Sequence, residues 1–155
     1  SHTRRRAVRN VLAALFIAVA APAAAQPPTT FVTPGDFAGQ PVHEGSATRR
    51  MLLSAVQPGA QAAFLDIRPG GRVPPHAHSQ EDLVLIVVVR GPVLYADGER
   101  FDPEALRPQA AGTVLLVPRG NWHFLEAGPD GALLLALPTR REALPPAVAA
   151  RLPAR

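Results

Sequence analysis

The stretches GGRVPPHAH (residues 70–78) and GTVLLVPRGNWH (residues 112–123) decide the fold of this chain. In each, a glycine precedes a β-prone run that ends at histidine. His76 and His78 are two residues apart, so on a strand their side chains point to the same face of the sheet. The two stretches therefore predict strands that carry histidines.

Short β-prone runs separated by proline, glycine and aspartate continue on both sides of these stretches. Many short strands at close spacing predict an all-β sandwich or barrel. The run 83–89 is apolar throughout, so we expect it to be covered on both faces. One turn of helix is predicted at 102–106 and a short helix at 147–152. The predicted strands are 50–56, 62–67, 72–78, 83–89, 93–96, 113–117, 122–125 and 132–137.

The chain has no cysteine, so histidine, aspartate and glutamate are its only strong metal ligands. Asp82 lies four residues after His78 and keeps its strand parity, while Glu81 is one residue closer and has a longer reach. Either carboxylate could complete a His–His–carboxylate set, and we prefer Asp82 slightly. In the alternative, both acids are solvated charges, as most acidic side chains are.

The two quoted stretches resemble the motifs of the cupin superfamily, written G(x)5HxH(x)3–4E(x)6G and G(x)5PxG(x)2H(x)3N. The chain departs from both motifs. Asp82 or Glu81 stands for the expected Glu, and Gly91 follows Asp82 two residues late, which a bulge in 83–89 would absorb. Ala127 replaces the last Asn. The matching residues are Gly70, His76 and His78 in the first motif, and Gly112, Pro118, Gly120 and His123 in the second.

The resemblance implies a double-stranded β-helix, the cupin or jelly-roll barrel, over residues 42–138. An extended N-terminal arm, 26–41, precedes it and a short tail, 139–155, follows. In cupins with these motifs, the motif histidines and the acid bind one divalent metal ion inside the barrel. Such ligands suit iron, manganese, nickel or zinc. The implied ligands are His76, His78, Asp82 or Glu81, and His123.

Residues 1–25 have the layout of a secretory signal peptide. A basic stretch is followed by an apolar run, 11–21, and by small residues that favour cleavage after Ala25. The apolar run is short of the ~20 residues that cross a bilayer. The arginines near the start also loosely match a twin-arginine signal, so both export routes stay open. We expect a periplasmic or secreted protein with no membrane segment after cleavage.

The formal net charge of +4 comes from the first 25 residues. Four of the 16 basic residues lie there, Arg4, Arg5, Arg6 and Arg9, and none of the 12 acidic ones does. The rest of the chain therefore carries 12 arginines against 12 acids, and it lacks the basic surface that phosphate binding needs. We do not expect nucleic acid as a partner.

Three imidazoles and one carboxylate would leave one or two metal positions open for a ligand. We expect a metal-dependent enzyme of oxygenase, lyase or isomerase type acting on a small organic molecule. The alternative is a noncatalytic small-molecule or metal-binding protein of the cell envelope. A third possibility is a structural role, and a homodimer is expected through edge strands and the arm.

Several further residues are given no role by the two motifs. Three acids, Glu99, Asp102 and Glu126, could supply a second acid or base but cannot be placed from sequence. Trp122 alternates in direction with His123 and is interpreted as a packing residue. Two histidines without partners in sequence, His2 and His43, are treated as incidental.

Overall fold

The computed structural model describes residues 25–53 and 62–155. The predicted signal peptide therefore lies outside the described residues, apart from Ala25. Residues 25–31 belong to a separate unit with the residues before them and contain no helix or strand, so the fold is that of the unit from Val32 to Arg155. In the described ranges, no helix has the length and hydrophobicity needed to span a membrane.

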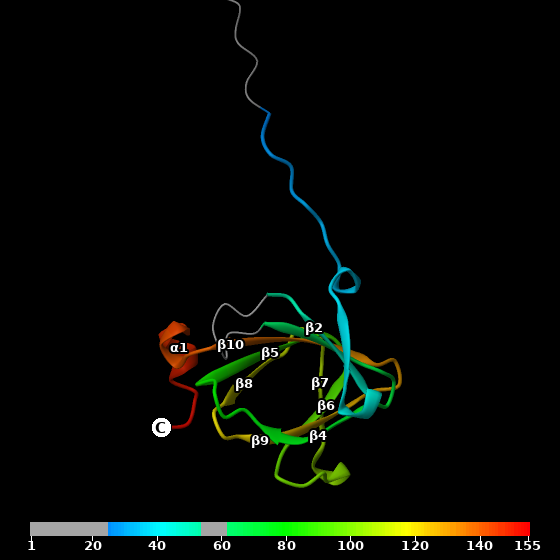
Figure 1. The fold of residues 1–155 in the computed structure, drawn as a ribbon. Coiled ribbons are helices and arrows are strands. Elements are labelled where there is room, and N and C mark those ends of the chain that lie inside the picture. Colours follow the sequence, from blue (N-terminus) through cyan, green and yellow to red (C-terminus); the bar gives the residue numbers. More distant parts are fainter. Residues whose placement is uncertain (1–24, 54–61) are drawn as a thin grey trace, which may run out of the picture. The chain divides into compact units, whose positions relative to one another are not determined.

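Two antiparallel sheets form a barrel, in which β10 and β5 lie opposite β9 and β4 (Figure 1). One sheet has six strands in the order β1-β2-β3-β10-β5-β8, and the other has four in the order β4-β9-β6-β7. This arrangement confirms the predicted all-β jelly-roll barrel. The strands are β1 (Gly39–Val42), β2 (Ala47–Met51), β3 (Ala63–Ile67), β4 (Arg72–Ala77), β5 (Leu83–Arg90), β6 (Val93–Asp97), β7 (Arg107–Gln109), β8 (Val114–Pro118), β9 (Trp122–Ala127) and β10 (Ala132–Thr139).

Helical segments are short and lie between or after the strands. The turn predicted at 102–106 is a 3-10 helix whose cap is Asp102, because its carboxylate accepts a hydrogen bond from the Glu104 N–H (3.0 Å). The helix predicted at 147–152 begins and ends earlier. The segments are η1 (Pro34–Asp36), η2 (His43–Gly45), η3 (Pro103–Ala105), η4 (Arg141–Ala143) and α1 (Pro146–Ala149).

The sequence did not predict β1 and β7. Each contains a proline, Pro41 in β1 and Pro108 in β7, and each lies at the edge of its sheet. Edge strands tolerate proline because the missing N–H faces away from the ladder. Since β1 pairs with β2 from Gly39 onward, the sheet begins inside the segment predicted as an arm.

The run 83–89 contains the predicted bulge. Leu133 of β10 pairs with Arg90 of β5, but Leu134 pairs with Val88, so Val89 is an extra residue on β5. On the β8 side, β5 pairs in regular register from Leu83 to Val87. The bulge therefore occurs at the end of β5 and leaves most of the strand regular.

The main core fills the space between the sheets. Aliphatic residues from both sheets form it, among them Ile67, Val73, Val88, Leu125 and Leu134, each at most 2% exposed. A second, smaller cluster joins Ala96, Leu106 and Phe124, with Phe101 of the 98–106 segment packed against it. The barrel thus has a closed aliphatic interior and a segment that covers one sheet from outside.

Replacing Ile67 by Ala should lower the free energy of unfolding by about 2–5 kcal/mol, because Ile67 is 1% exposed in the main core. Urea denaturation monitored by circular dichroism measures this change. The exposed neighbour Arg68 offers a control, since Arg68→Ala should change the value by about 0.5 kcal/mol or less. An Ile67→Ala protein as stable as the parent would contradict the core described above.

Candidate metal centre

A bulge at Pro74–Pro75 sets the direction of His76 in β4 and of His78, which directly follows the strand. Val73 pairs with Leu125 of β9 and His76 pairs with His123, so two prolines on β4 lie opposite the single residue Phe124. In a regular strand Val73 and His76 would face opposite sides. Because of the extra residue, both face the interior. Neither proline has an N–H to donate, and β4 is an edge strand where this is tolerated.

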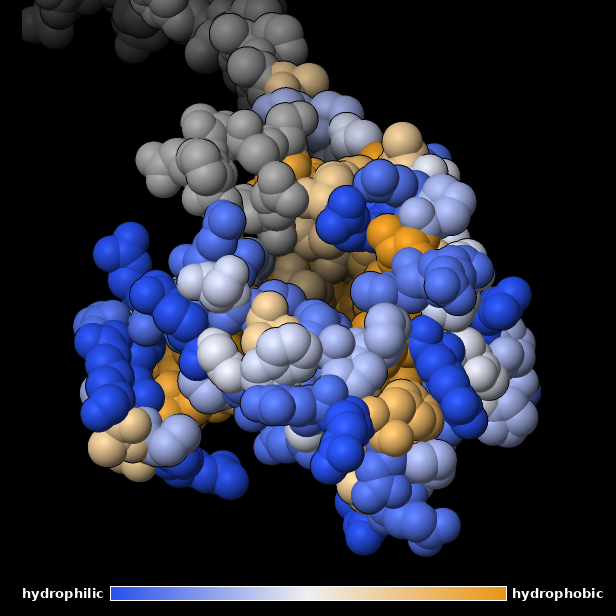
Figure 2. All heavy atoms as spheres, turned by 60° about the horizontal axis from the view of Figure 1, so that its bottom comes forward, coloured by the Kyte–Doolittle hydropathy of each residue, from blue (hydrophilic) through white to orange (hydrophobic). Residues whose placement is uncertain are grey.

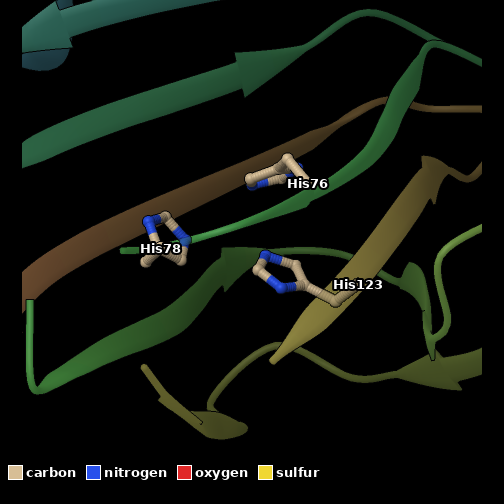
Figure 3. A group of neighbouring side chains, drawn as sticks. All are labelled: His76, His78 and His123. Carbon is tan, nitrogen blue, oxygen red and sulfur yellow. The ribbon is translucent and has the colours of Figure 1, made fainter. Parts of the chain in front are cut away.

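The three imidazoles of His76, His78 and His123 come together inside the barrel (Figure 3). One ring nitrogen from each lies within 4.8 Å of the others. The ring centroids are 4.3 Å apart for His76 and His123, and 5.3 Å apart for the other two pairs. This group could hold a metal ion, and its residues are separated by 45 or more positions between β4 and β9.

The hydrogen bonds of these rings leave their Nε2 atoms free. Nδ1–H of His76 donates to the Pro74 carbonyl (2.9 Å), and Nδ1–H of His123 donates to the Asn121 carbonyl (3.1 Å). Among the described residues, the buried side-chain nitrogen and oxygen atoms without a partner are Nε2 of His78 and Nε2 of His123. A buried unpaired nitrogen is unfavourable, whereas a metal ion would satisfy it. The residues present therefore fit a metal.

The structure brings neither predicted carboxylate into the group of three histidines. Asp82, which we preferred, is turned toward the C-terminal tail, where it accepts hydrogen bonds from the Arg141 N–H (3.0 Å) and from Arg155 (3.2 Å). Glu81 lies nearer, with Oε2 3.9 Å from Nδ1 of His78. The buried nitrogen without a partner is Nε2, on the other edge of the ring, so Glu81 faces the His78 ring from the side opposite Nε2.

The histidines line a small apolar cavity of about 80 Å3. Figure 2 shows a face of the molecule with a hollow whose depth is coloured as hydrophobic, while the surface around it is mostly hydrophilic. Such a lining excludes water and strengthens electrostatic interactions inside. The cavity is lined by His43, Leu65, Val73, His76, His78, Ile86, His123, Leu125, Leu134 and Ala136.

Burial favours the neutral form of the histidines. Burial, with a smaller contribution from the nearby His76, lowers the pKa of His123 from 6.5 to about 4. Burial also lowers the pKa of His78, again with a contribution from His76. Neutral imidazole is the form that binds metal ions, so these ligands are ready for a metal at neutral pH.

The other acids named from sequence lie away from the histidines. Asp102 caps η3, and Glu126 pairs with Arg72 at 3.0 Å. Glu99 is exposed in the turn after β6. Trp122 is 43% exposed, so it does not pack into the core as interpreted from sequence.

Sequence reasoning missed two neighbours of the site. The ring of Tyr95 on β6 is stacked on His123 with centroids 5.6 Å apart, and its hydroxyl donates to Asp97 (3.3 Å). Burial raises the pKa of Tyr95, with a further contribution from Asp97, so its hydroxyl stays protonated. The second neighbour is His43 of η2, which lines the cavity. The pairing of β6 with β9 could have suggested Tyr95, but no sequence signal indicated His43.

The comparisons with known proteins agree with this fold. No protein-family model and no curated protein matches the chain. Several solved structures match the chain. KdgF from a Halomonas species is 20% identical with a TM-score of 0.52, and the match covers 76% of this chain and 100% of that one. An RmlC-like cupin from Shewanella frigidimarina is 19% identical with a TM-score of 0.54, over 76% of this chain and 97% of that one.

A third solved structure, from Thermotoga maritima, is described as a predicted oxalate decarboxylase. It is 21% identical with a TM-score of 0.56, and the match covers 71% of this chain and 100% of that one. At these identities the likeness establishes the fold. The chain therefore has the fold of these cupin structures, as the two motifs predicted.

We predict that the metal-free protein loses stability as the pH falls from about 6.5 toward 4. The pKa of His123 is 6.5 in the unfolded chain and about 4 in the fold, so the unfolded chain binds the proton more readily between these values. The free energy of unfolding should fall by about 2–4 kcal/mol over this range and level off below it. Urea denaturation of chelator-treated protein at several pH values measures the slope. A His123→Gln variant should show a smaller slope, and an equal slope would contradict the assignment.

The bulge makes a prediction about two single-residue deletions. Deleting Pro75 leaves one residue opposite Phe124, so His76 still pairs with His123 and metal binding should be retained. Deleting Ala77 instead moves His78 into a position that faces outward, and metal binding should fall at least tenfold. Isothermal titration with zinc measures both affinities, and circular dichroism checks the fold. Loss of binding in the Pro75 deletion, or an affinity equal to that of the parent in the Ala77 deletion, would contradict this register.

Proposed function

We propose that this chain is a metal-dependent cupin enzyme acting on a small organic molecule, with one divalent ion held by Nε2 of His76, His78 and His123. The observation that carries the proposal is the pair of buried Nε2 atoms, on His78 and His123, that lack any partner among the described residues. Iron, manganese, nickel and zinc all accept such ligands.

Three protein ligands favour a functional site over a structural one. A structural metal site is closed, most often by four protein ligands, whereas a catalytic site keeps a position for water or substrate. Asp82 is engaged by Arg141 and Arg155, and Glu81 faces the outer nitrogen of His78. Neither acid therefore fills the remaining positions in the proposed site.

Each part of the chain has a distinct role in this proposal. The carbonyls of Pro74 and Asn121 orient the rings of His76 and His123. Glu81 faces Nδ1 of His78, on the ring edge away from the proposed ion. The aliphatic walls exclude water from the cavity. A bound ion would supply a Lewis acid or an oxygen-binding centre. Cupin neighbours whose names describe enzymes, such as the Thermotoga maritima protein, support a catalytic role over a purely binding one.

Metal analysis of the purified protein tests the ligand set. The parent should carry close to one equivalent of metal per chain, and His76→Ala and His123→Ala should each lose most of it. Asp82→Asn and Glu81→Gln are the matched controls, because both should keep the metal, Glu81→Gln with an affinity lower by about tenfold. Unchanged metal content in both histidine variants would end the proposal, and loss in Asp82→Asn would assign a fourth ligand.

A turnover screen separates an enzyme from a binding protein. The metal-loaded protein is incubated in air with small hydroxy-acids, dicarboxylates and phenols, and substrate loss is followed by NMR. The proposal expects at least one compound to be consumed by the parent and not by His123→Ala. Tight binding without turnover across the panel would favour the noncatalytic alternative.

Export and dimer formation are further proposals. The layout of residues 1–25 supports cleavage after Ala25 and a location in the periplasm or outside the cell. The edge strands β1 and β7, each with a proline, and β8 are the candidates for pairing with a second copy.

A further inference from the structure

His43 is shared by the small cavity of the three histidines and a second, larger pocket. This outer pocket of about 520 Å3 lies beside the start of β4, and His43 lines both spaces. The ring of His43 is half-buried, and its centroid is 6.1 Å from that of His76. His43 does not belong to the group of three histidines that could share an ion. It is therefore a fourth imidazole next to the centre, outside the ligand set.

The turn that carries His43 is held firmly in place. Ser46, which is 7% exposed, donates through its hydroxyl to the Arg72 carbonyl at the start of β4 (2.5 Å). The Ser46 carbonyl accepts from the Arg68 N–H (3.1 Å), and it lies so near Gly71 that a Cβ there would come within 2.6 Å. His43 itself has a left-handed φ of 52°. A non-glycine residue keeps such a conformation only where its surroundings enforce it.

His43 is the polar side chain that remains in the cavity once the three proposed ligands are set aside. The other lining residues are aliphatic: Leu65, Val73, Ile86, Leu125, Leu134 and Ala136. Within the described residues, the imidazole of His43 has no hydrogen-bond partner. A ligand bound in this cavity would therefore find its hydrogen bond from the protein at His43.

The charges around the site favour an anionic ligand. Three neutral imidazoles would leave the charge of a divalent ion uncompensated in an aliphatic cavity, and an anion in the open position would balance it. The outer pocket adds two arginines, Arg68 and Arg72, against one acid, Glu44, although Arg72 is also paired with Glu126. A cavity of about 80 Å3 admits a group of only a few atoms, so the remainder of a longer ligand would extend past His43.

We infer that the substrate of this centre is a short carboxylate-bearing molecule, and that His43 donates a hydrogen bond to its metal-bound carboxylate. His43 thereby orients the ligand and is a specificity-determining residue rather than a metal ligand. This inference rests on the proposed metal centre.

The test uses the cobalt(II)-loaded protein with acetate and succinate as probes, followed by the visible absorption of the ion. His43→Phe keeps a ring of similar size and removes the hydrogen bond, so the Kd for both probes should rise about tenfold or more at unchanged cobalt content. His43→Gln keeps an N–H donor and should restore most of the affinity. Glu99→Gln is the control, because Glu99 is exposed in the turn after β6 and does not line the cavity, so the Kd should stay within about twofold.

Three outcomes would overturn the inference while leaving the metal centre intact. One is that the parent binds cobalt but neither carboxylate changes its spectrum. Another is that His43→Phe binds the probes as tightly as the parent. The third is that His43→Phe loses cobalt, which would make His43 a ligand. If the parent itself binds no cobalt or other divalent ion, the proposed function fails, and that result is distinct from all three.

Discussion

The direction of two side chains on β4 controls what the interior of this barrel can do. Val73 and His76 both face inward only because Pro74 and Pro75 together lie opposite one residue of β9. In a strand without the bulge, alternation would place Val73 and His76 on opposite faces. The same step supplies the Pro74 carbonyl that holds the His76 ring. The bulge in edge strand β4 thus determines which side chains of that strand face the interior and how the His76 ring is oriented.

Three imidazoles in an aliphatic cavity lower the free energy of unfolding of the metal-free protein. His123 is completely buried, and its Nε2 has no partner among the described residues. An aliphatic residue of similar size would avoid the desolvation of that nitrogen and would pack with Leu125 and Val73. Such a trade is common where side chains are arranged for a ligand, since the ligand restores what the empty arrangement lacks. The surrounding aliphatic core, with Ile67, Val88 and Leu134 nearly fully buried, supplies the stability that tolerates it.

Sequence reasoning reached the barrel and the three histidines because both depend on local patterns. Spacing between glycine, proline and histidine indicates turns and strand faces, and these survive into the structure. Sequence reasoning failed where the pairing of distant strands determines the structure. β1 and β7 contain prolines that read as loop until their edge positions are known, and the direction of Asp82 depends on Arg141 of the tail. The sequence indicates no role for His43, because nothing near it shows that Ser46 holds this turn against the start of β4.

The position of the carboxylates separates this centre from the one that the motif resemblance implied. A carboxylate ligand would cancel one positive charge of the ion, so a neutral ligand such as water could occupy an open position without a large desolvation penalty. Here Asp82 is committed to Arg141 and Arg155, and Glu81 faces the outer nitrogen of His78. In the proposed centre, the balancing negative charge would then come from the ligand, because two unbalanced positive charges are costly in an apolar cavity. In the proposed centre, the position of the acid in the first motif would therefore decide whether the ligand has to carry the balancing charge.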